Sequence, residues 1–292
     1  MTLDHTHIEF YRKNGYLIVT DVLDADRLSR CRACIDGIAA EAASANQGDE
    51  RFDLESGHSL DAPRIFRINA PDRFYPEFRE LVSDPVITGI LEPLIGSNIR
   101  LNASKLNMKP PRNGAPVEWH QDWAFYPHTN QDLLAVGVLL DDMDEENGPL
   151  LVVPGSHKGP IYDHHIDGIF SGAIDRTKCD IDFASAVPLV AKAGSVTVHH
   201  VRMIHGSGPN LSRRGRRLFL MEFAAADAWP LMGLSADFDE YNARIVAGSS
   251  TLVPRMEAVP VRVPVPDDPD RQCETVYQYH RALKNRYFEW PD

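Results

Sequence analysis

The spacing of apolar residues changes character near residue 99. Before that point apolar positions recur as on one face of a helix, and after it they form short β-branched runs separated by turn residues. For the first part we predict helices over 5–14, 25–43 and 76–95, a strand over 16–19, and a polar loop over 45–62. The Asn14-Gly15 pair is the predicted end of the first helix.

The second part of the chain has the pattern of a β structure. Its apolar runs cover 99–106, 133–140, 150–153, 187–190, 195–200 and 217–223, with turn signals such as Asn147-Gly148-Pro149 between them. Many short strands at this spacing are typical of an antiparallel sandwich or barrel. Prolines concentrate in 253–269, which indicates a segment on the surface, and a last helix is predicted over 274–287.

No internal repeat, low-complexity tract or linker divides the chain, so we expect a single domain over 1–292. It would consist of a mainly helical N-terminal part (1–98), a β core (99–225) and a C-terminal extension (226–292). The expected fold class is therefore mainly β with flanking helices.

Composition excludes several classes of protein. Apolar residues make up 43% and charged residues 25% of the 292 positions, as in ordinary globular proteins. A net charge of −12 argues against nucleic acid and anionic membranes as partners. The apolar run 133–140 is too short to cross a bilayer, and the first ten residues lack the features of a signal peptide. We therefore expect a soluble, cytoplasmic protein.

The segment Trp119-His120-Gln121-Asp122-Trp123 carries the sharpest chemical signal. Alternate side chains of a strand share a face, so His120 and Asp122 are expected to bind the same metal. A third ligand must come from another strand, and His205, just before a glycine turn, is the leading candidate. Two histidines and one carboxylate occupy one face of an octahedral ion and leave three positions open, which suits non-haem Fe(II) better than zinc.

Two neighbouring histidines compete for a place in this site. His199 and His200 lie on the same predicted strand, where adjacent residues face opposite ways, so at most one points inward. We take His200 as a candidate that hydrogen-bonds to a metal ligand and orients it. The alternative is that His200 only packs at the end of the strand.

Further candidates surround the metal motif. A basic cluster precedes the strand 218–223, and an arginine on a strand beside a metal can grip a carboxylate with two parallel hydrogen bonds; a solvated basic turn is the alternative. The cluster consists of Arg213, Arg214, Arg216 and Arg217. The aromatic residues Trp123, Phe125 and Tyr126 are candidates for an apolar wall beside substrate, with core packing as the alternative. Arg64 and Arg67 are candidate partners for an anionic substrate, but a surface role is the favoured interpretation of each taken alone.

Several segments in the same order carry a family resemblance. They are residues 10–16 (FYRKNGY), 107–110 (NMKP), 120–122 (HQD), 147–157 (NGPLLVVPGSH) and 205–210 (HGSGPN), with Arg216 eleven residues after His205. Together they resemble the phytanoyl-CoA dioxygenase family of Fe(II)/2-oxoglutarate-dependent oxygenases, over about residues 10–223.

The resemblance implies a double-stranded β-helix, or jelly-roll, core. It implies His120, Asp122 and His205 as ligands of Fe(II), with 2-oxoglutarate as cosubstrate and O2 at the remaining position. Arg216 would pair with the distal carboxylate of 2-oxoglutarate, and Asn107 and Ser207 match family positions that also contact it. The reaction expected is hydroxylation of a C–H bond of a small molecule, with release of succinate and CO2.

Other functions stay open at this point. A carboxylate at Asp122 argues against halogenation, but desaturation and ring formation use the same iron ligands. A cupin-type metalloenzyme without 2-oxoglutarate and a non-catalytic jelly roll that binds a small molecule are the alternatives. A hydrolase and a nucleotide-binding fold are disfavoured, because G-x-S-x-G and G-x-x-x-x-G-K-[ST] are absent.

Overall fold

The computed structural model describes residues 3–44, 49–54, 58–61, 64–112, 114–234, 237–267 and 275–290. Its helices are α1 (His5–Asn14), α2 (Ala25–Ala43), α3 (Pro71–Phe74), α4 (Pro76–Val82), α5 (Pro85–Ile95), α6 (Phe238–Ala243) and α7 (Val276–Arg281). Its strands are β1 (Tyr16–Val19), β2 (Phe52–Leu54), β3 (Ile65–Asn69), β4 (Ile99–Lys109), β5 (Val117–His120), β6 (Leu133–Leu139), β7 (Leu150–Val152), β8 (His165–Ile166), β9 (Ile169–Phe170), β10 (Val187–Pro188), β11 (Val196–His200), β12 (His205–Ser207), β13 (Arg216–Ala225) and β14 (Ile245–Ala247).

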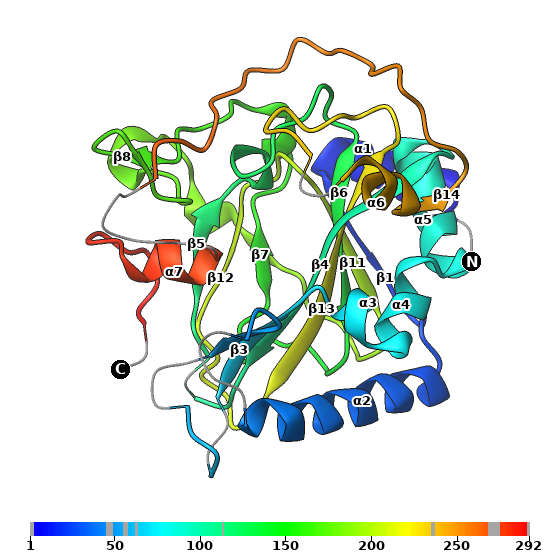
Figure 1. Ribbon diagram of the computed structural model, residues 1–292. Helices are drawn as coiled ribbons and strands as arrows, with labels where there is room; N and C mark the ends of the chain where they lie inside the picture. Colours follow the sequence, from blue (N-terminus) through cyan, green and yellow to red (C-terminus); the bar gives the residue numbers. More distant parts are fainter. Residues whose placement is uncertain are drawn as a thin grey trace.

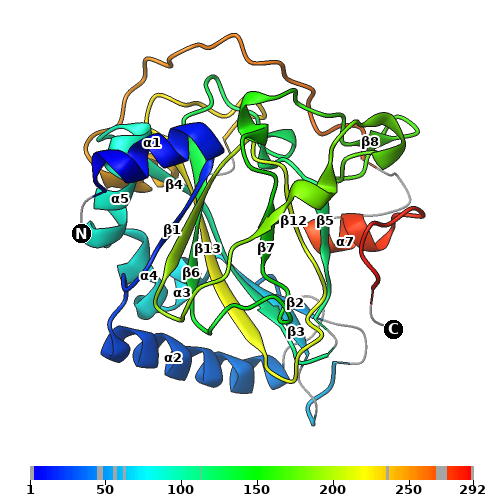
Figure 2. The ribbon, with the colours of Figure 1, turned by 180° about the vertical axis from the view of Figure 1, so that it is seen from behind.

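Two antiparallel sheets face each other and form a jelly roll, as the sequence predicts (Figures 1 and 2). The large sheet has the strand order β1-β11-β6-β13-β4-β3-β2, and β14 also pairs with β4. The small sheet has the order β10-β7-β12-β5. Each buries one face against the other, which is how sheets of this kind make a core.

Helices cover the outer face of the large sheet. In Figure 1 helices α2 to α5 lie along this face, and the terminal α7 lies on the opposite side, beside β5 and β12. The main hydrophobic core fills the space between the helices and the sheet, with Ile35 and Ile38 of α2 packed with Val136, Val198 and other strand residues. The space between the two sheets holds a cavity lined by both apolar and polar side chains.

Most predicted elements are confirmed, and three are corrected. The predicted helix 76–95 is two helices, because Pro85 begins α5 and the Asp84 side chain caps it by accepting from the Val86 N–H. The predicted loop 45–62 contains strand β2, which pairs with β3; residues 45–48, 55–57 and 62 lie outside the described residues. The predicted helix 274–287 is helical only over Val276–Arg281.

The segment 253–267 has no regular secondary structure, and in Figure 1 it crosses the top of the molecule in orange. Most of its residues are half-buried or exposed, which confirms the surface course that its prolines predict; 268 and 269 lie outside the described residues. Within the described ranges, no helix has both the length and the apolar character needed to span a membrane.

Candidate active site

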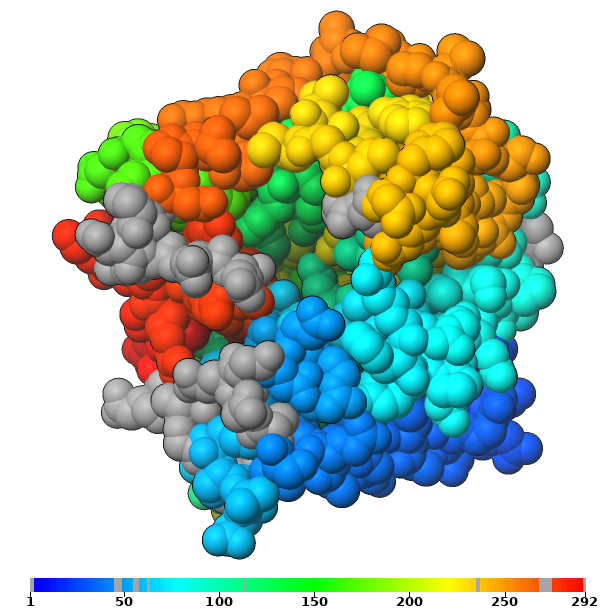
Figure 3. All heavy atoms as spheres, in the orientation of Figure 1, coloured from blue at the N-terminus to red at the C-terminus, as the bar shows by residue number. Residues whose placement is uncertain are grey.

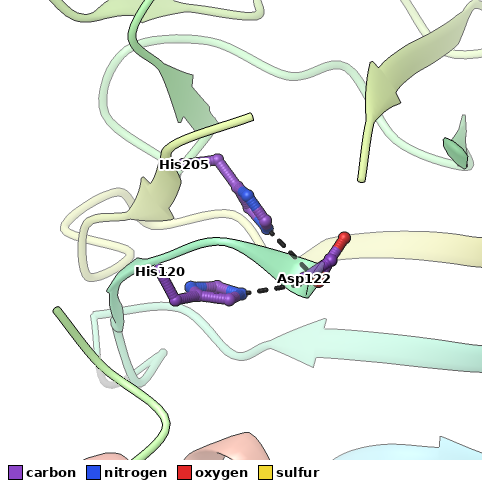
Figure 4. Close-up of side chains that lie close together, drawn as sticks. All are labelled: His120, Asp122 and His205. Atoms are coloured by element: carbon purple, nitrogen blue, oxygen red, sulfur yellow. Dashed lines mark ion pairs between the residues drawn. The ribbon is translucent and has the colours of Figure 1, made fainter. Parts of the chain in front are cut away.

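Three predicted metal ligands meet between the two sheets (Figure 4). His120 ends β5 and pairs in register with His205, the first residue of β12. Asp122 does not share the strand of His120, as the sequence had suggested, because it begins a 3-10 turn over Asp122–Ala124. The Nε2 atoms of both histidines lie 3.8 Å from Oδ1 of Asp122, and all three ligand atoms lie within 4.8 Å of one another.

Hydrogen bonds fix which ring nitrogen of each histidine is free for a metal. Nδ1 of His120 donates to the Glu118 carbonyl at 2.7 Å, and Nδ1 of His205 donates to the Met203 carbonyl at 3.0 Å. A carbonyl only accepts, so each Nε2 keeps its lone pair. Burial lowers the pKa of both rings, that of His205 to about 4, so both are neutral at physiological pH. Neutral imidazoles are the form that a metal needs.

Asp122 is held from two more directions. Burial opposes its ionisation, but His205, the hydrogen bond from His199, and His120 together hold its pKa below the usual range. Nε2 of His199 lies 3.2 Å from Oδ2 of Asp122, and the hydroxyl of Tyr126 hydrogen-bonds to the same carboxyl group. A carboxylate fixed in this way points its other oxygen at the metal position.

His199, and not His200, is therefore the histidine of β11 that faces the site. Nδ1 of His200 accepts from the Arg202 N–H, and its ring lies 5.3 Å from that of His157, on the side of the N-terminal helix. Strand alternation required one of the pair to face outward. The prediction that His200 is the inward-facing histidine was wrong. Which of the two faces the site depends on the register of β11 with β6, in which His199 pairs with Ala135.

Arg216 supplies a cation at the other end of the cavity. It begins β13, is 3% exposed, and donates through Nη2 to the Gly148 carbonyl at 2.9 Å. Its Nε and Nη1 atoms are buried and have no partner. Burial lowers its pKa to about 10, which leaves it cationic at neutral pH. Unpaired, buried guanidinium donors favour a carboxylate as their ligand, so the residues present fit 2-oxoglutarate.

Ser207 and Asn107 line the same cavity. The Ser207 hydroxyl donates to the Gly148 carbonyl at 3.0 Å and accepts from Nζ of Lys109 at 2.6 Å. Lys109 is 1% exposed, and burial, followed by the nearby Arg216 charge, lowers its pKa. It holds Ser207 in place beside Arg216.

The cavity that joins these groups is small, at about 60 Å³. Six predicted residues line it, namely His120, Asp122, His205, Asn107, Ser207 and Arg216. Arg67 lies at its edge, where Nε donates to Oδ1 of Asn107 at 3.3 Å. The structure thus brings together every residue predicted to bind metal or cosubstrate.

The three aromatic candidates have different positions. Phe125 packs its ring edge-on against His120, with centroids 5.6 Å apart, and it is not among the residues that line the cavity. Tyr126 contacts Asp122, as described above. Trp123 is not among the residues that line the cavity: it packs with Val201 and Ala224, and its indole N–H donates to the Pro260 carbonyl. Trp123 is therefore part of a hydrophobic core cluster, which was the alternative to a place beside substrate.

Several residues of the site carry no signal in the sequence. His164 accepts from the Gln121 N–H at 2.9 Å and is buried. His280 joins the Glu118 N–H and the Gly172 carbonyl, at 2.9 and 2.8 Å. Tyr277 lines the cavity. Their partners lie far away in sequence, so only the fold brings them to the site.

A buried triad of two histidines and one carboxylate, with an arginine across a small cavity in a jelly roll, defines a mononuclear non-haem iron oxygenase. Comparisons with known proteins agree with this class. The family model for phytanoyl-CoA dioxygenase (PhyH) matches residues 11–218. A relative from Stutzerimonas stutzeri, named as a probable alpha-ketoglutarate-dependent hypophosphite dioxygenase, is 38% identical over 95% of this chain and 97% of its own.

Two more distant proteins agree as well. The L-proline trans-4-hydroxylase of Streptomyces griseoviridis is 29% identical over 73% of this chain and 83% of its own. The crystal structure of EctD from S. alaskensis with 2-oxoglutarate and 5-hydroxyectoine shares the fold, with a TM-score of 0.67 at 20% identity, over 90% of this chain and 89% of that chain.

The chain belongs to the phytanoyl-CoA dioxygenase family. It is an Fe(II)- and 2-oxoglutarate-dependent dioxygenase, and of the functions left open by the sequence this one is confirmed. Membership of this family argues against the two alternatives, a cupin-type metalloenzyme without 2-oxoglutarate and a non-catalytic jelly roll that binds a small molecule.

Proposed function

We propose that the enzyme oxygenates a small anion, and that hypophosphite is such a substrate. The observation that carries this proposal is Arg67, which is 7% exposed and has a buried Nη2 atom with no partner. Its nearest carboxylate oxygen, on Asp53, is 3.7 Å from Nε, beyond hydrogen-bond distance. A buried cation with a free donor next to a metal cavity favours an anionic ligand.

The other charges of the site leave room for one more negative charge. Ferrous iron, Asp122, Arg216 and doubly charged 2-oxoglutarate balance one another when all are present. Lys105 and Glu222, which also line the cavity, form an ion pair at 2.7 Å. Arg67 has its carboxylate partner Asp53 at 3.7 Å, and its unpaired Nη2 donor can bind a monoanionic substrate.

The relative from Stutzerimonas stutzeri supports a substrate as small as hypophosphite. In that reaction one oxygen atom of O2 enters a P–H bond and gives phosphite. The other enters 2-oxoglutarate, which loses CO2 and becomes succinate, so atoms and electrons balance. A substrate of this kind replaces the C–H bond expected from the sequence by a P–H bond.

Each side chain has a defined task in this proposal. His120, Asp122 and His205 bind the iron, which supplies the oxidation of substrate by O2 when it is bound. We propose that Arg216, with Ser207 and Asn107, orients the cosubstrate, while Phe125 keeps water from the face of His120. Arg67 holds the substrate anion beside the metal. We place the reaction in the cytoplasm, where 2-oxoglutarate and reduced iron are available.

A small zwitterion is the second candidate, and its ammonium group would share the Glu222 carboxylate with Lys105. L-Proline, the substrate named for one relative, represents this class.

The test is a turnover assay with both substrates. Purified protein with Fe(II), 2-oxoglutarate and O2 is given hypophosphite or L-proline, and succinate is measured together with phosphite by 31P NMR. We expect hypophosphite to give succinate and phosphite in equal amounts, and Asp122→Ala to give neither. Succinate formed with L-proline and not with hypophosphite would establish the second candidate instead.

A further inference from the structure

Helix α7 brings Tyr277 to the cavity from outside residues 11–218, the part matched by the family model. Val276 and Tyr277 line the cavity, and Tyr277 is 4% exposed. Figure 3 shows the C-terminal segment in red at the rim of a hollow, with green atoms of the β core recessed beside it. The C-terminal segment thus forms part of the wall around the reaction.

This wall is fixed to the strand that carries His120. The Glu118 carboxylate accepts from the N–H groups of Tyr287 and Phe288, at 2.8 and 3.3 Å, and from the indole of Trp290 at 3.3 Å. His280 adds its bonds to the Glu118 N–H and the Gly172 carbonyl. Helix α7 is therefore held in one position relative to the metal ligands.

The ring of Tyr277 is also fixed, whereas its hydroxyl is not. The ring stacks on Phe66 with centroids 5.4 Å apart and planes at 12°, and the Arg67 guanidinium lies 5.3 Å from its centre. Within the described part of the chain, no hydrogen bond to the Tyr277 hydroxyl is found. The hydroxyl is therefore available to pair with a ligand that enters the cavity.

The hydroxyl is a donor at neutral pH. Burial raises the pKa of Tyr277, although the positive charges of Arg67, Arg216 and Lys105 oppose this effect. A protonated phenol among cations complements an oxyanion, because it donates a hydrogen bond where the cations supply charge.

Arg67 and Arg216 stand on different strands, which separates two anion positions. Arg216 is on β13, and Arg67 is on β3, where it pairs with Asn107 of the intervening β4. Neighbouring strands lie about 4.8 Å apart, so β3 and β13 are roughly 10 Å apart. Tyr277 packs on the β3 side, against Phe66 and Arg67. We therefore assign the substrate anion to Arg67 and the cosubstrate carboxylate to Arg216.

We infer that Tyr277 binds the primary substrate: its hydroxyl donates a hydrogen bond to the substrate oxyanion whose charge Arg67 balances. The inference rests on the proposed function for the choice of a small anion. Tyr277 then helps to determine which anions the enzyme accepts, and the C-terminal extension is a specificity element of the fold.

The experiment measures binding without turnover. Wild type and Tyr277→Phe are loaded with Fe(II) and 2-oxoglutarate without O2, and hypophosphite is titrated by calorimetry. We expect the Kd for hypophosphite to rise about tenfold or more in the variant, as for loss of a hydrogen bond to a charged group. The Kd for 2-oxoglutarate, followed by the absorbance of its Fe(II) complex, is expected to stay within about twofold.

Tyr279→Phe is the matched control, because its hydroxyl bonds to Asp267 and it does not line the cavity. An unchanged hypophosphite Kd in Tyr277→Phe overturns the inference, and so does weaker 2-oxoglutarate binding with hypophosphite unaffected. If the variant weakens hypophosphite binding but O2 yields no phosphite, the inference stands and the proposed function fails. If wild type does not bind hypophosphite, both fail.

Discussion

The carboxylate of Asp122 is shared between the metal position and His199. Oδ1 lies 3.8 Å from Nε2 of both metal-binding histidines, while Oδ2 lies 3.2 Å from Nε2 of His199. The ring of His199 thereby fixes the rotation of the carboxylate, although it is not one of the three ligands.

Replacement of His199 tests this arrangement. His199→Asn is too short to reach Oδ2, so the carboxylate rotates more freely and we expect Fe(II) affinity to fall about 10- to 100-fold. Metal titration in the absence of O2 measures the change. His200→Asn is the control, since Asn can still accept from the Arg202 N–H on the outward side. Equal losses in the two variants would show that His199 acts only through packing.

Arg216→Lys tests the cosubstrate end of the cavity. Lysine keeps the charge but not the two parallel donors, so we expect the Kd for 2-oxoglutarate to rise about 10- to 100-fold, with Fe(II) binding retained. Arg217→Lys is the control, because Arg217 pairs with Asp141 and does not line this cavity. The absorbance of the Fe(II) complex with 2-oxoglutarate measures both. Unchanged binding in Arg216→Lys would place the distal carboxylate elsewhere.

Buried histidines predict that acid destabilises the fold. Burial lowers the pKa of His128 to about 4 and that of His200 to about 3, below the ordinary value near 6.5. The unfolded chain therefore binds more protons than the folded one as the pH falls from 6.5 towards 4. Stability is lost over that window, by about 1 kcal/mol per pH unit for each such histidine.

Urea unfolding of the metal-free protein at pH 5 to 7 measures this slope. In His128→Asn, the change in the free energy of unfolding per pH unit should be smaller by the contribution of one histidine, about 1 kcal/mol. His5→Asn, at an exposed position, should leave it unchanged. A slope that is the same in His128→Asn and in wild type would show that His128 is already charged in the folded state.

Two glycines give opposite predictions for the same substitution. Gly15 ends α1 at φ 81°, and a Cβ there would come within 2.4 Å of His157. Gly37 lies exposed in α2 with nothing within 4 Å of an added Cβ. We expect Gly37→Ala to stabilise by about 0.5–1 kcal/mol and Gly15→Ala to destabilise by more than about 1 kcal/mol. Urea denaturation of both variants provides the comparison, and a stabilised Gly15→Ala would contradict the left-handed cap.

The metal triad and Arg216 were predictable because local spacing and motif order carry them. The inward face of β11 was not, since it follows from pairing between strands rather than from the His199-His200 pair itself. The break before Pro85 was readable in principle, because proline lacks the N–H that a continuous helix needs. The contacts of Glu118, Tyr277 and His280 join segments more than 150 residues apart, and no short pattern encodes them.

The attachment of the C-terminal segment to Glu118 also affects when the site can form during synthesis. All three metal ligands have been made once the ribosome has passed His205, but the cavity wall still lacks Tyr277. Until the last residues emerge, the Glu118 carboxylate has no donors from Tyr287, Phe288 or Trp290. The cavity wall is therefore completed only after the segment that carries Tyr277 and the Glu118 donors has been made.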